Sequence, residues 1–262
     1  MSENTMPADS QRAPRVVVIG LASCFGCQIN ITNIERHLMD VLGQIDLGYW
    51  QLTSSDPMPD AFDVAVIEGA VTTKEAEETV RAARERAHAV IALGACAVTG
   101  GIPGIASDNF EERVEEIYGD AAPDACGDLV APRPVSDVIA VDFEVRCCPI
   151  DPFDFVRVLD AALYGSNSLP ATSALCGECS RNEKGCFYKQ GTMCLGLVTR
   201  SGCGAKCPAL GRPCNGCAGL SPDSNVEAAR YAVRKNGLEV ERFNDALEMF
   251  NAVALAAAEG EE

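Results

Sequence analysis

The sequence predicts an α/β protein, with a doubly wound parallel sheet followed by a cysteine-rich domain of little regular structure. Two observations predict this division. Through about residue 165, short β-branched runs alternate with segments of helical periodicity, the pattern of a parallel sheet covered by helices. Beyond Tyr164 the pattern changes. Residues 173–217, here called the cysteine-rich segment, hold eight cysteines and many glycines but show no regular hydrophobic period.

The first half of the expected sheet follows a polar leader. Residues 1–13 are rich in Ser, Gln, Asp and Glu, and we predict that they are disordered. Residues 15–20 (Arg-Val-Val-Val-Ile-Gly) are typical of a short, buried parallel strand. Residues 28–42 carry apolar side chains at helical spacing, with Gly43 where a C-cap would lie. Residues 45–52 are the second predicted strand.

The second half repeats this alternation. Residues 62–67 predict a third strand, and residues 72–87 predict a charged helix with a threonine N-cap. Residues 89–93 and 138–145 predict the fourth and fifth strands. Residues 152–164 predict a helix with proline in its first turn. This order of elements fits a flavodoxin-like arrangement.

Three parts are therefore expected along the chain. They are a leader at 1–13, a flavodoxin-like domain at 14–165, and a third part at 166–262. The cysteine-rich segment cannot build an apolar core of its own, so we expect bound metal to hold it together. Two helices are expected after it, near residues 223–235 and 242–257.

Composition narrows the function. The chain has 262 residues, a net charge of −17 and 14 cysteines. The negative charge argues against nucleic-acid binding, which needs clustered Lys and Arg. The polar start of the chain has no apolar signal core, and no apolar stretch reaches roughly 18 residues, so we expect a cytoplasmic chain without a membrane anchor. In a reducing cytosol, cysteines in this number are expected to bind metal rather than to form a disulfide scaffold.

Four cysteines that follow predicted strands form the first candidate metal site. Cys24 and Cys27 come directly after the first strand. Cys96 follows the fourth strand and Cys148 closely follows the fifth, so all four are expected at the carboxyl edge of the sheet, where open α/β sheets bind ligands. Pro149 follows Cys148, as in ferredoxin sequences, and favours a 4Fe–4S cluster. A structural zinc site and four unrelated buried cysteines are the alternatives.

The cysteine-rich segment holds two further groups of four cysteines. The first group is Cys176, Cys179, Cys186 and Cys194, and the second is Cys203, Cys207, Cys214 and Cys217. Each group contains a Cys-x-x-Cys pair, which indicates two iron–sulfur clusters, with two zinc ribbons as the alternative. The segment also has six Lys or Arg and two Glu, a positive balance that would stabilise anionic clusters. A solvated basic surface would explain the same charge.

Other familiar sites are missing from the sequence. No Gly-x-Gly-x-x-Gly follows the first strand, and residues 94–101 lack the lysine of a phosphate-binding loop. No nucleophile and base are recognisable as a pair, so we expect a chain that conducts electrons. We interpret Cys126 as an ordinary thiol. Cys147 is a competitor of Cys148 at the first site, and Pro149 favours Cys148.

In combination, these motifs resemble the small subunits of nickel–iron hydrogenases, over about residues 15–225. The resemblance is carried by Leu21-Ala-Ser-Cys24-Phe-Gly-Cys27-Gln, Ile67-Glu-Gly-Ala-Val71, Gly94-Ala-Cys96-Ala-Val-Thr-Gly-Gly101 and Cys148-Pro149-Ile150. The run Cys194-Leu-Gly-Leu-Val-Thr-Arg-Ser-Gly-Cys203-Gly-Ala-Lys-Cys207-Pro looks like the cytoplasmic, cofactor-coupled branch, which includes sulfhydrogenase delta subunits. The 20-kilodalton subunit of respiratory complex I shares the first fold but lacks the cysteine-rich tail.

The resemblance implies three 4Fe–4S clusters. It implies a proximal cluster at Cys24, Cys27, Cys96 and Cys148, a medial cluster at Cys203, Cys207, Cys214 and Cys217, and a distal cluster at Cys176, Cys179, Cys186 and Cys194. Membrane-linked relatives have a histidine where Cys176 stands and only three medial cysteines, so all three clusters are expected to be of the 4Fe–4S type here. The family usually has glycine at the position of Cys147.

The resemblance also implies partners. The nickel–iron site would lie in a separate large subunit, and electrons would pass to an iron–sulfur flavoprotein that reduces NAD or NADP. A heterodisulfide-reductase-type partner is the alternative acceptor. Glu68 matches a family acid near the subunit interface, on a proton route, although a capping or solvated acid is an equal interpretation.

The competing hypothesis from another class is a free-standing ferredoxin-like carrier, or a zinc-stabilised interaction module. Metal identity and co-purification with a large subunit distinguish these proteins from a hydrogenase subunit. The final acceptor, the direction of catalysis and the oxygen tolerance are not encoded in recognisable motifs.

Overall fold

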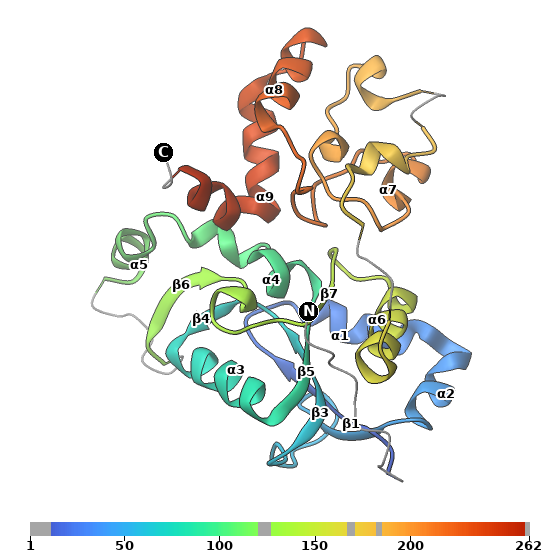
Figure 1. Cartoon of the computed structure of the whole chain (residues 1–262). Coiled ribbons are helices and arrows are strands. Elements are labelled where there is room, and N and C mark those ends of the chain that lie inside the picture. Colours follow the sequence, from blue (N-terminus) through green and yellow to red (C-terminus); the bar gives the residue numbers. More distant parts are fainter. Residues whose placement is uncertain (1–11, 120–126, 167–170, 182–184, 260–262) are drawn as a thin grey trace. The chain divides into compact units, whose positions relative to one another are not determined.

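The chain divides into two compact units, Met1–Asn167 and Ser168–Glu262 (Figure 1). The first unit contains a parallel sheet with helices, and the second contains the cysteine-rich segment followed by two helices. This computed structural model describes residues 12–119, 127–166, 171–181 and 185–259. Among these residues, no helix combines the length and the apolar character needed to cross a membrane.

The sheet of the first unit has five strands in the order β2-β1-β3-β5-β7, and every neighbouring pair is parallel. Its strands are β1 (Arg15–Gly20), β2 (Asp46–Trp50), β3 (Phe62–Glu68), β5 (Ala87–Leu93) and β7 (Phe143–Val145). Counting these five alone, the order is 2-1-3-4-5, as in flavodoxin-like folds. The predicted fold class is therefore confirmed.

Helices cover both faces of this sheet (Figure 1). The covering helices are α1 (Gly26–Ile31), α3 (Lys74–Arg86), α4 (Gly94–Thr99) and α6 (Pro152–Tyr164). Because side chains alternate along a strand, Val18 packs with Phe155 on the α6 side, whereas Val17 packs with Val80 on the α3 side. The predicted helices at residues 72–87 and 152–164 are confirmed. Thr73 caps α3 by accepting a hydrogen bond from the Ala76 N–H at 3.1 Å.

The helix predicted at residues 28–42 is interrupted. The chain forms α1, then a 3₁₀ segment at Thr32–His37, then α2 (Leu38–Leu42), with Gly43 as the C-cap. Polar side chains explain the break: the Thr32 hydroxyl donates to the Ile29 carbonyl at 2.7 Å, and the Asn33 amide donates to the Asn30 side chain at 2.7 Å. Such local bonds compete with regular helix formation.

The strand predicted at residues 138–145 is wrong for its first five residues. Only β7 pairs in the sheet, and Val135–Asp137 form a 3₁₀ turn before it. The apolar side chain of Ile139 is buried against the α3 face instead of belonging to a strand. Asp142 then takes the place of a ladder residue, since its side chain accepts from the Val90 N–H at 2.8 Å.

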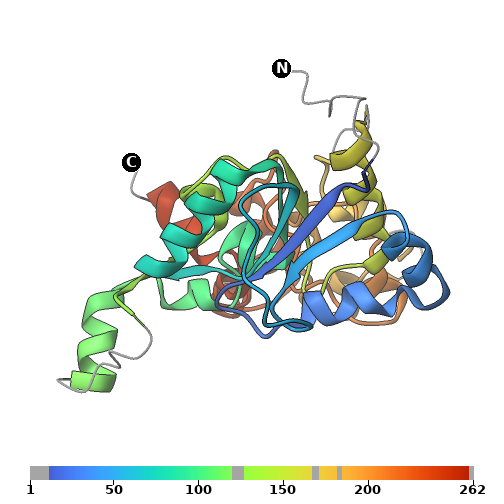
Figure 2. The same ribbon diagram turned by 90° about the horizontal axis from the view of Figure 1, so that it is seen from below.

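Three short elements between β3 and β7 were not predicted from the sequence. A two-stranded antiparallel sheet pairs β4 (Val71–Thr73) with β6 (Leu129–Arg133). Helix α5 (Phe110–Tyr118) extends away from the main sheet (Figure 2), and none of its residues is buried. These elements have only three, five and nine residues, and such short segments give weak sequence signals.

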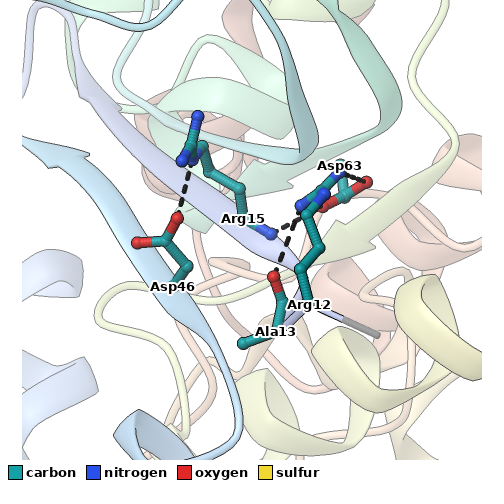
Figure 3. A network of polar contacts seen from close by, with 5 residues as sticks. All are labelled: Arg12, Ala13, Arg15, Asp46 and Asp63. Carbon is teal, nitrogen blue, oxygen red and sulfur yellow. Dashed lines mark hydrogen bonds and ion pairs between the residues drawn. The ribbon is translucent and has the colours of Figure 1, made fainter. Parts of the chain in front are cut away.

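Ion pairs fasten the amino ends of the first three parallel strands (Figure 3). The carboxylate of Asp63 accepts hydrogen bonds from Arg12 at 2.7 and 3.0 Å and from the Arg15 backbone N–H at 2.6 Å. The Arg15 side chain pairs with Asp46 at 2.7 Å. Arg12 is therefore bound, although it belongs to the predicted disordered leader. The disorder predicted for residues 1–11 lies outside the described residues.

The second unit contains the two predicted helices, α8 (Val226–Lys235) and α9 (Val240–Glu259). Leu195 and Val198 from the cysteine-rich segment pack between them with Phe243. A second apolar cluster joins Leu175 and Phe187 with neighbouring cysteines inside the segment. The segment was expected to have no apolar core of its own. It contains a small one around Leu175 and Phe187, whereas Leu195 and Val198 pack with α8 and α9, and Leu197 and Leu210 are exposed. In the described parts of the segment, regular helical structure consists of 3₁₀ turns at Leu175–Gly177, Phe187–Gln190 and Leu195–Leu197, and of α7 (Lys206–Ala209).

The Asp63 network predicts unequal effects of two substitutions. Asp63→Ala is expected to lower the free energy of unfolding by roughly 2 kcal/mol, because the Arg15 backbone N–H loses a charged acceptor. Asp46→Ala removes only a solvent-exposed ion pair and is expected to cost at most about 1 kcal/mol. Urea denaturation of both variants beside the unchanged protein measures the difference. Equal losses would contradict the role given to Asp63.

Candidate metal centres

The first group of cysteines lies at the carboxyl edge of the parallel sheet. Cys24 and Cys27 follow β1, and Cys27 is the second residue of α1. Cys96 lies in the first turn of α4, directly after β5, and Cys148 follows β7. Glu68 is the last residue of β3. The strand order reverses between β1 and β3, so the loops after these two strands leave the sheet on opposite sides of that point. Such a point is where doubly wound sheets form their ligand crevice.

Electrostatic effects among these thiols show that they are close together. The pKa of Cys27 is raised to about 12, mainly by burial, with smaller contributions from the charges of Glu68, Cys148 and Cys96. Burial likewise raises the pKa of Cys96 to about 11, with contributions from Cys148 and Cys24. The structure thus brings together all four cysteines of the predicted first site. Cys27 is buried, whereas Cys24 and Cys148 are exposed.

Two glycines lie so close to these sulfur atoms that a side chain at either position would collide with them. Gly94 has φ +81°, and a Cβ atom added there would lie 2.5 Å from the Cys27 Sγ. Gly101 has φ +52°, and a Cβ atom would lie 2.8 Å from the Cys96 backbone and 2.9 Å from its Sγ. Both positions therefore require glycine for conformation and for space.

Cys147 occupies a conformation that favours glycine. Its φ is +89°, in the left-handed region, and its carbonyl accepts from the Ala95 N–H of α4 at 3.0 Å. The resemblance gave glycine as the usual residue at this position, and this backbone conformation explains the preference. The following peptide bond, between Cys148 and Pro149, is cis.

Buried polar side chains support the same edge. Glu68 is 2% exposed, and its Oε1 accepts from the Cys27 backbone N–H at 3.1 Å. Its Oε2 is buried without a hydrogen-bond partner in the described chain. Gln28, the residue after Cys27, is fully buried and accepts from the Trp50 indole at 2.6 Å. Sequence reasoning missed Gln28, although a polar residue on the apolar face of α1 was the available signal.

The second group gathers around Cys176. The pKa of Cys176 is raised to about 11, mainly by burial, with smaller contributions from the charges of Cys194, Cys179 and Cys186. A Cβ atom on Gly196 would lie 3.6 Å from both the Cys176 and the Cys194 Sγ atoms. The backbone at Gly196 therefore runs beside two sulfurs, as expected of a loop that encloses a cluster.

The third group gathers around Cys207 and Cys214. Burial raises the pKa of Cys207, with Cys217 and Cys203 adding to the shift. Burial raises the pKa of Cys214 to about 12, and Cys217 contributes to that shift as well. The Thr199 hydroxyl lies 3.5 Å from the Cys214 Sγ. Each predicted set of four cysteines is thus gathered in one place.

The second and third groups touch each other. The Cys214 backbone N–H donates to the Cys194 Sγ at 3.2 Å, and the Leu195 N–H donates to the Cys214 carbonyl at 3.0 Å. Within the described residues, no set of three or more His, Cys, Asp or Glu side chains is arranged to hold a single metal ion. The interpretation of Cys126 as an ordinary thiol falls outside the described residues.

The donor chemistry of all three groups fits iron–sulfur clusters. Thiolates are soft ligands that suit such clusters, and four of them complete a 4Fe–4S site. The glycines at positions 94, 101 and 196 lie where side chains would fill the space beside the sulfurs. The buried surroundings favour neutral thiols, so metal binding at these sites must displace protons.

The chain is similar to several known proteins. Residues 24–162 match the family described as NADH ubiquinone oxidoreductase, 20 Kd subunit. Sulfhydrogenase 2 subunit delta of Pyrococcus furiosus is 36% identical over 80% of this chain and 87% of its own length. A vhu subunit of the F420-non-reducing hydrogenase of Methanocaldococcus jannaschii is 31% identical over 81% of this chain and 84% of its own. The NAD-reducing hydrogenase HoxS subunit delta of Cupriavidus necator is 26% identical over 61% of this chain and 83% of its own.

A solved structure shows the same fold. A chain of the NAD⁺-reducing NiFe-hydrogenase in its H2-reduced state matches with a TM-score of 0.54 at 24% identity, over 61% of this chain and 96% of that one. Fold and thiol groups together define an iron–sulfur electron-transfer subunit of an oxidoreductase complex. The chain belongs to the family of the 20 Kd subunit and, within it, to the small subunits of nickel–iron hydrogenases. Its partner is accordingly a hydrogenase large subunit.

Gly94 offers a test of the first site. Gly94→Ala is expected to displace the Cys27 sulfur and to lower the metal content of that site, because the new Cβ atom would collide with Sγ. Gly237→Ala is the matched control: Gly237 has φ +71° with no atom within 4 Å, so that variant suffers only backbone strain of about 1–2 kcal/mol. Metal analysis and spin-resonance spectra of both purified variants compare them. If the metal content of Gly94→Ala were unchanged, Cys27 could not be a ligand in the position beside this glycine.

Proposed function

We propose that the chain relays electrons between the large-subunit active site and a further protein through three 4Fe–4S clusters. The observation that carries the proposal is the gathering of twelve cysteines into three groups of four thiols. The proposed proximal ligands are Cys24, Cys27, Cys96 and Cys148. The proposed medial ligands are Cys203, Cys207, Cys214 and Cys217, and the proposed distal ligands are Cys176, Cys179, Cys186 and Cys194.

The clusters supply one-electron redox chemistry, and the chain supplies their surroundings. Burial of Cys27, Cys194 and Cys214 excludes water from part of each site. The backbone N–H groups at Cys27 and Cys214 are held in place by Glu68 and by the Cys194 sulfur. Fixed donors and a low local dielectric are the means by which a protein sets cluster potentials.

For Glu68, a place on a proton route is part of the proposal. Its support is a buried carboxylate with one oxygen engaged by the Cys27 N–H and the other without a partner in the described chain. The alternative is a structural role, since the same bond fixes the start of α1 beside the first site.

The proposed acceptor is an iron–sulfur flavoprotein that reduces NAD or NADP. The NAD-reducing relative from Cupriavidus necator supports it, although that relative matches only 61% of this chain. The second candidate is a heterodisulfide-reductase-type partner. In its favour, the sulfhydrogenase and F420-non-reducing relatives match more of the chain at higher identity, and their names specify no nicotinamide. The cytoplasmic location stays a prediction from the sequence.

The two adjacent cysteines predict contrasting variants. Cys148→Ser is expected to destroy or convert the proximal cluster, because Cys148 lies close enough for its charge to raise the pKa values of both Cys27 and Cys96. Cys147→Ser is expected to leave it intact, since the family resemblance implies glycine at position 147. Spin-resonance spectra of the reduced complexes test the pair. If Cys147→Ser alone abolished the proximal signal, the ligand assignment would be reversed.

The electron acceptor is tested with the purified complex. Hydrogen-dependent reduction of NAD or NADP is expected, together with a flavin-bearing subunit identified by mass spectrometry. A one-electron dye is the positive control for electron flow through this chain. Dye reduction without nicotinamide reduction, in a preparation without flavin, would exclude the preferred acceptor and favour the heterodisulfide-reductase type. No hydrogen-dependent reduction of either would count against the relay itself.

A further inference from the structure

We propose that Glu178 is a positioning residue that holds the loop carrying Cys203 against the turn carrying Cys176 and Cys179. It thereby fixes the medial site relative to the distal site. The inference rests on the proposed function, because it takes Cys203 as a medial ligand and the two flanking cysteines as distal ligands. Glu178 lies between those distal ligands in the sequence.

One carboxylate oxygen of Glu178 accepts hydrogen bonds from the loop on both sides of Cys203. Its Oε1 accepts from the Gly202 backbone N–H at 3.0 Å and from the Ala205 backbone N–H at 3.3 Å. The Cys203 Sγ lies 4.0 Å from the same oxygen. The side chain therefore binds the loop on both sides of Cys203, and it comes from a residue that directly precedes the distal cysteine Cys179.

The loop around Cys203 contains three residues with positive φ. Gly202, Gly204 and Ala205 have φ values of +113°, +65° and +46°. The Gly202 and Ala205 N–H groups both donate to one carboxylate oxygen, as loop amides do in a concave anion-binding turn. Ala205 is 1% exposed, so without the carboxylate its N–H would lose its partner in a buried position. A positive φ at this alanine is strained, and the bond to Glu178 opposes its relaxation.

Backbone pairing joins the same two segments but stops short of Cys203. The Leu175 N–H donates to the Thr199 carbonyl at 2.8 Å, and the Ser201 N–H donates to the Ser173 carbonyl at 2.9 Å. The side chain of Glu178 continues this pairing over the next residues, where the chain turns into α7. Its role is therefore distinct from that of the pairing, which fixes the residues before the loop.

Glu178 has a second effect through its charge. The cysteine-rich segment holds six Lys or Arg and only two Glu, so this carboxylate is an unusual group in its surroundings. Negative charge beside a cluster ligand disfavours reduction of the cluster and lowers its potential. The geometric effect needs an oxygen acceptor, whereas the electrostatic effect needs the charge. A glutamine at position 178 keeps the oxygen acceptor but removes the charge.

The test uses the intact complex with Glu178→Gln and Glu178→Ala. Glu248→Gln and Glu248→Ala are the matched controls, because Glu248 is an exposed acid on α9 in the same unit. Hydrogen exchange, followed by mass spectrometry, is measured over residues 199–207. In Glu178→Ala, exchange at these residues is expected to rise roughly tenfold, since two amides lose a charged acceptor. Glu178→Gln is expected to restore most of the protection.

Redox titration followed by spin resonance supplies the second readout. The medial signal is expected to titrate at a higher midpoint potential in both Glu178 variants than in the Glu248 controls. Exchange in Glu178→Ala equal to that in Glu248→Ala would overturn the positioning role, and unchanged potentials would overturn the electrostatic effect. If the unchanged protein gave no medial signal, the proposed function would fail. The exchange measurement would still decide the role of Glu178, because it does not depend on which metal is bound.

Discussion

The parallel direction of β1, β3, β5 and β7 is the constraint on which the first candidate metal site depends. Because every carboxyl end points to the same edge, loops far apart in the sequence deliver Cys24, Cys27, Cys96 and Cys148 to one place. The strand ends fix the backbone, and the left-handed glycine at position 94 leaves space for a sulfur. At the opposite edge, Asp63 secures the amino ends, so the sheet is held at both ends of its strands.

The second unit also brings cysteines that are distant in the sequence close together, but with far less regular structure. Its two thiol groups are held by short turns, by a seam of backbone bonds and by the apolar contacts of Leu195 and Val198 with α8 and α9. The bond from the Cys214 N–H to the Cys194 sulfur joins the two groups directly. Thiol groups in contact suit electron transfer, since they leave little distance for an electron to cross. The buried surroundings that raise the thiol pKa values also mean that metal and fold stabilise each other.

Much of this organisation could be predicted from the sequence. Long apolar runs such as Val16–Ile19 and capped helices such as α3 and α6 carry strong local signals, and the cysteine spacing indicated the three groups. The errors have two causes: local side-chain hydrogen bonds that break a helix, and tertiary contacts that decide which apolar residues join the sheet. Thr32 and Asn33 interrupt a helix through local bonds, and Ile139 is apolar because it covers the sheet, not because it pairs. The role of Glu178 could not be predicted, because its partners lie 24 and 27 residues away in a loop without periodicity.

Metal content tests the central claim, that three groups of four thiols hold three clusters, most directly. Elemental analysis of the complex, purified without oxygen and normalised to the amount of this chain, should give about twelve irons attributable to it and no zinc. Iron in the large subunit is counted separately, by analysis of that subunit alone. About four irons in this chain, or zinc in stoichiometric amount, would contradict the account.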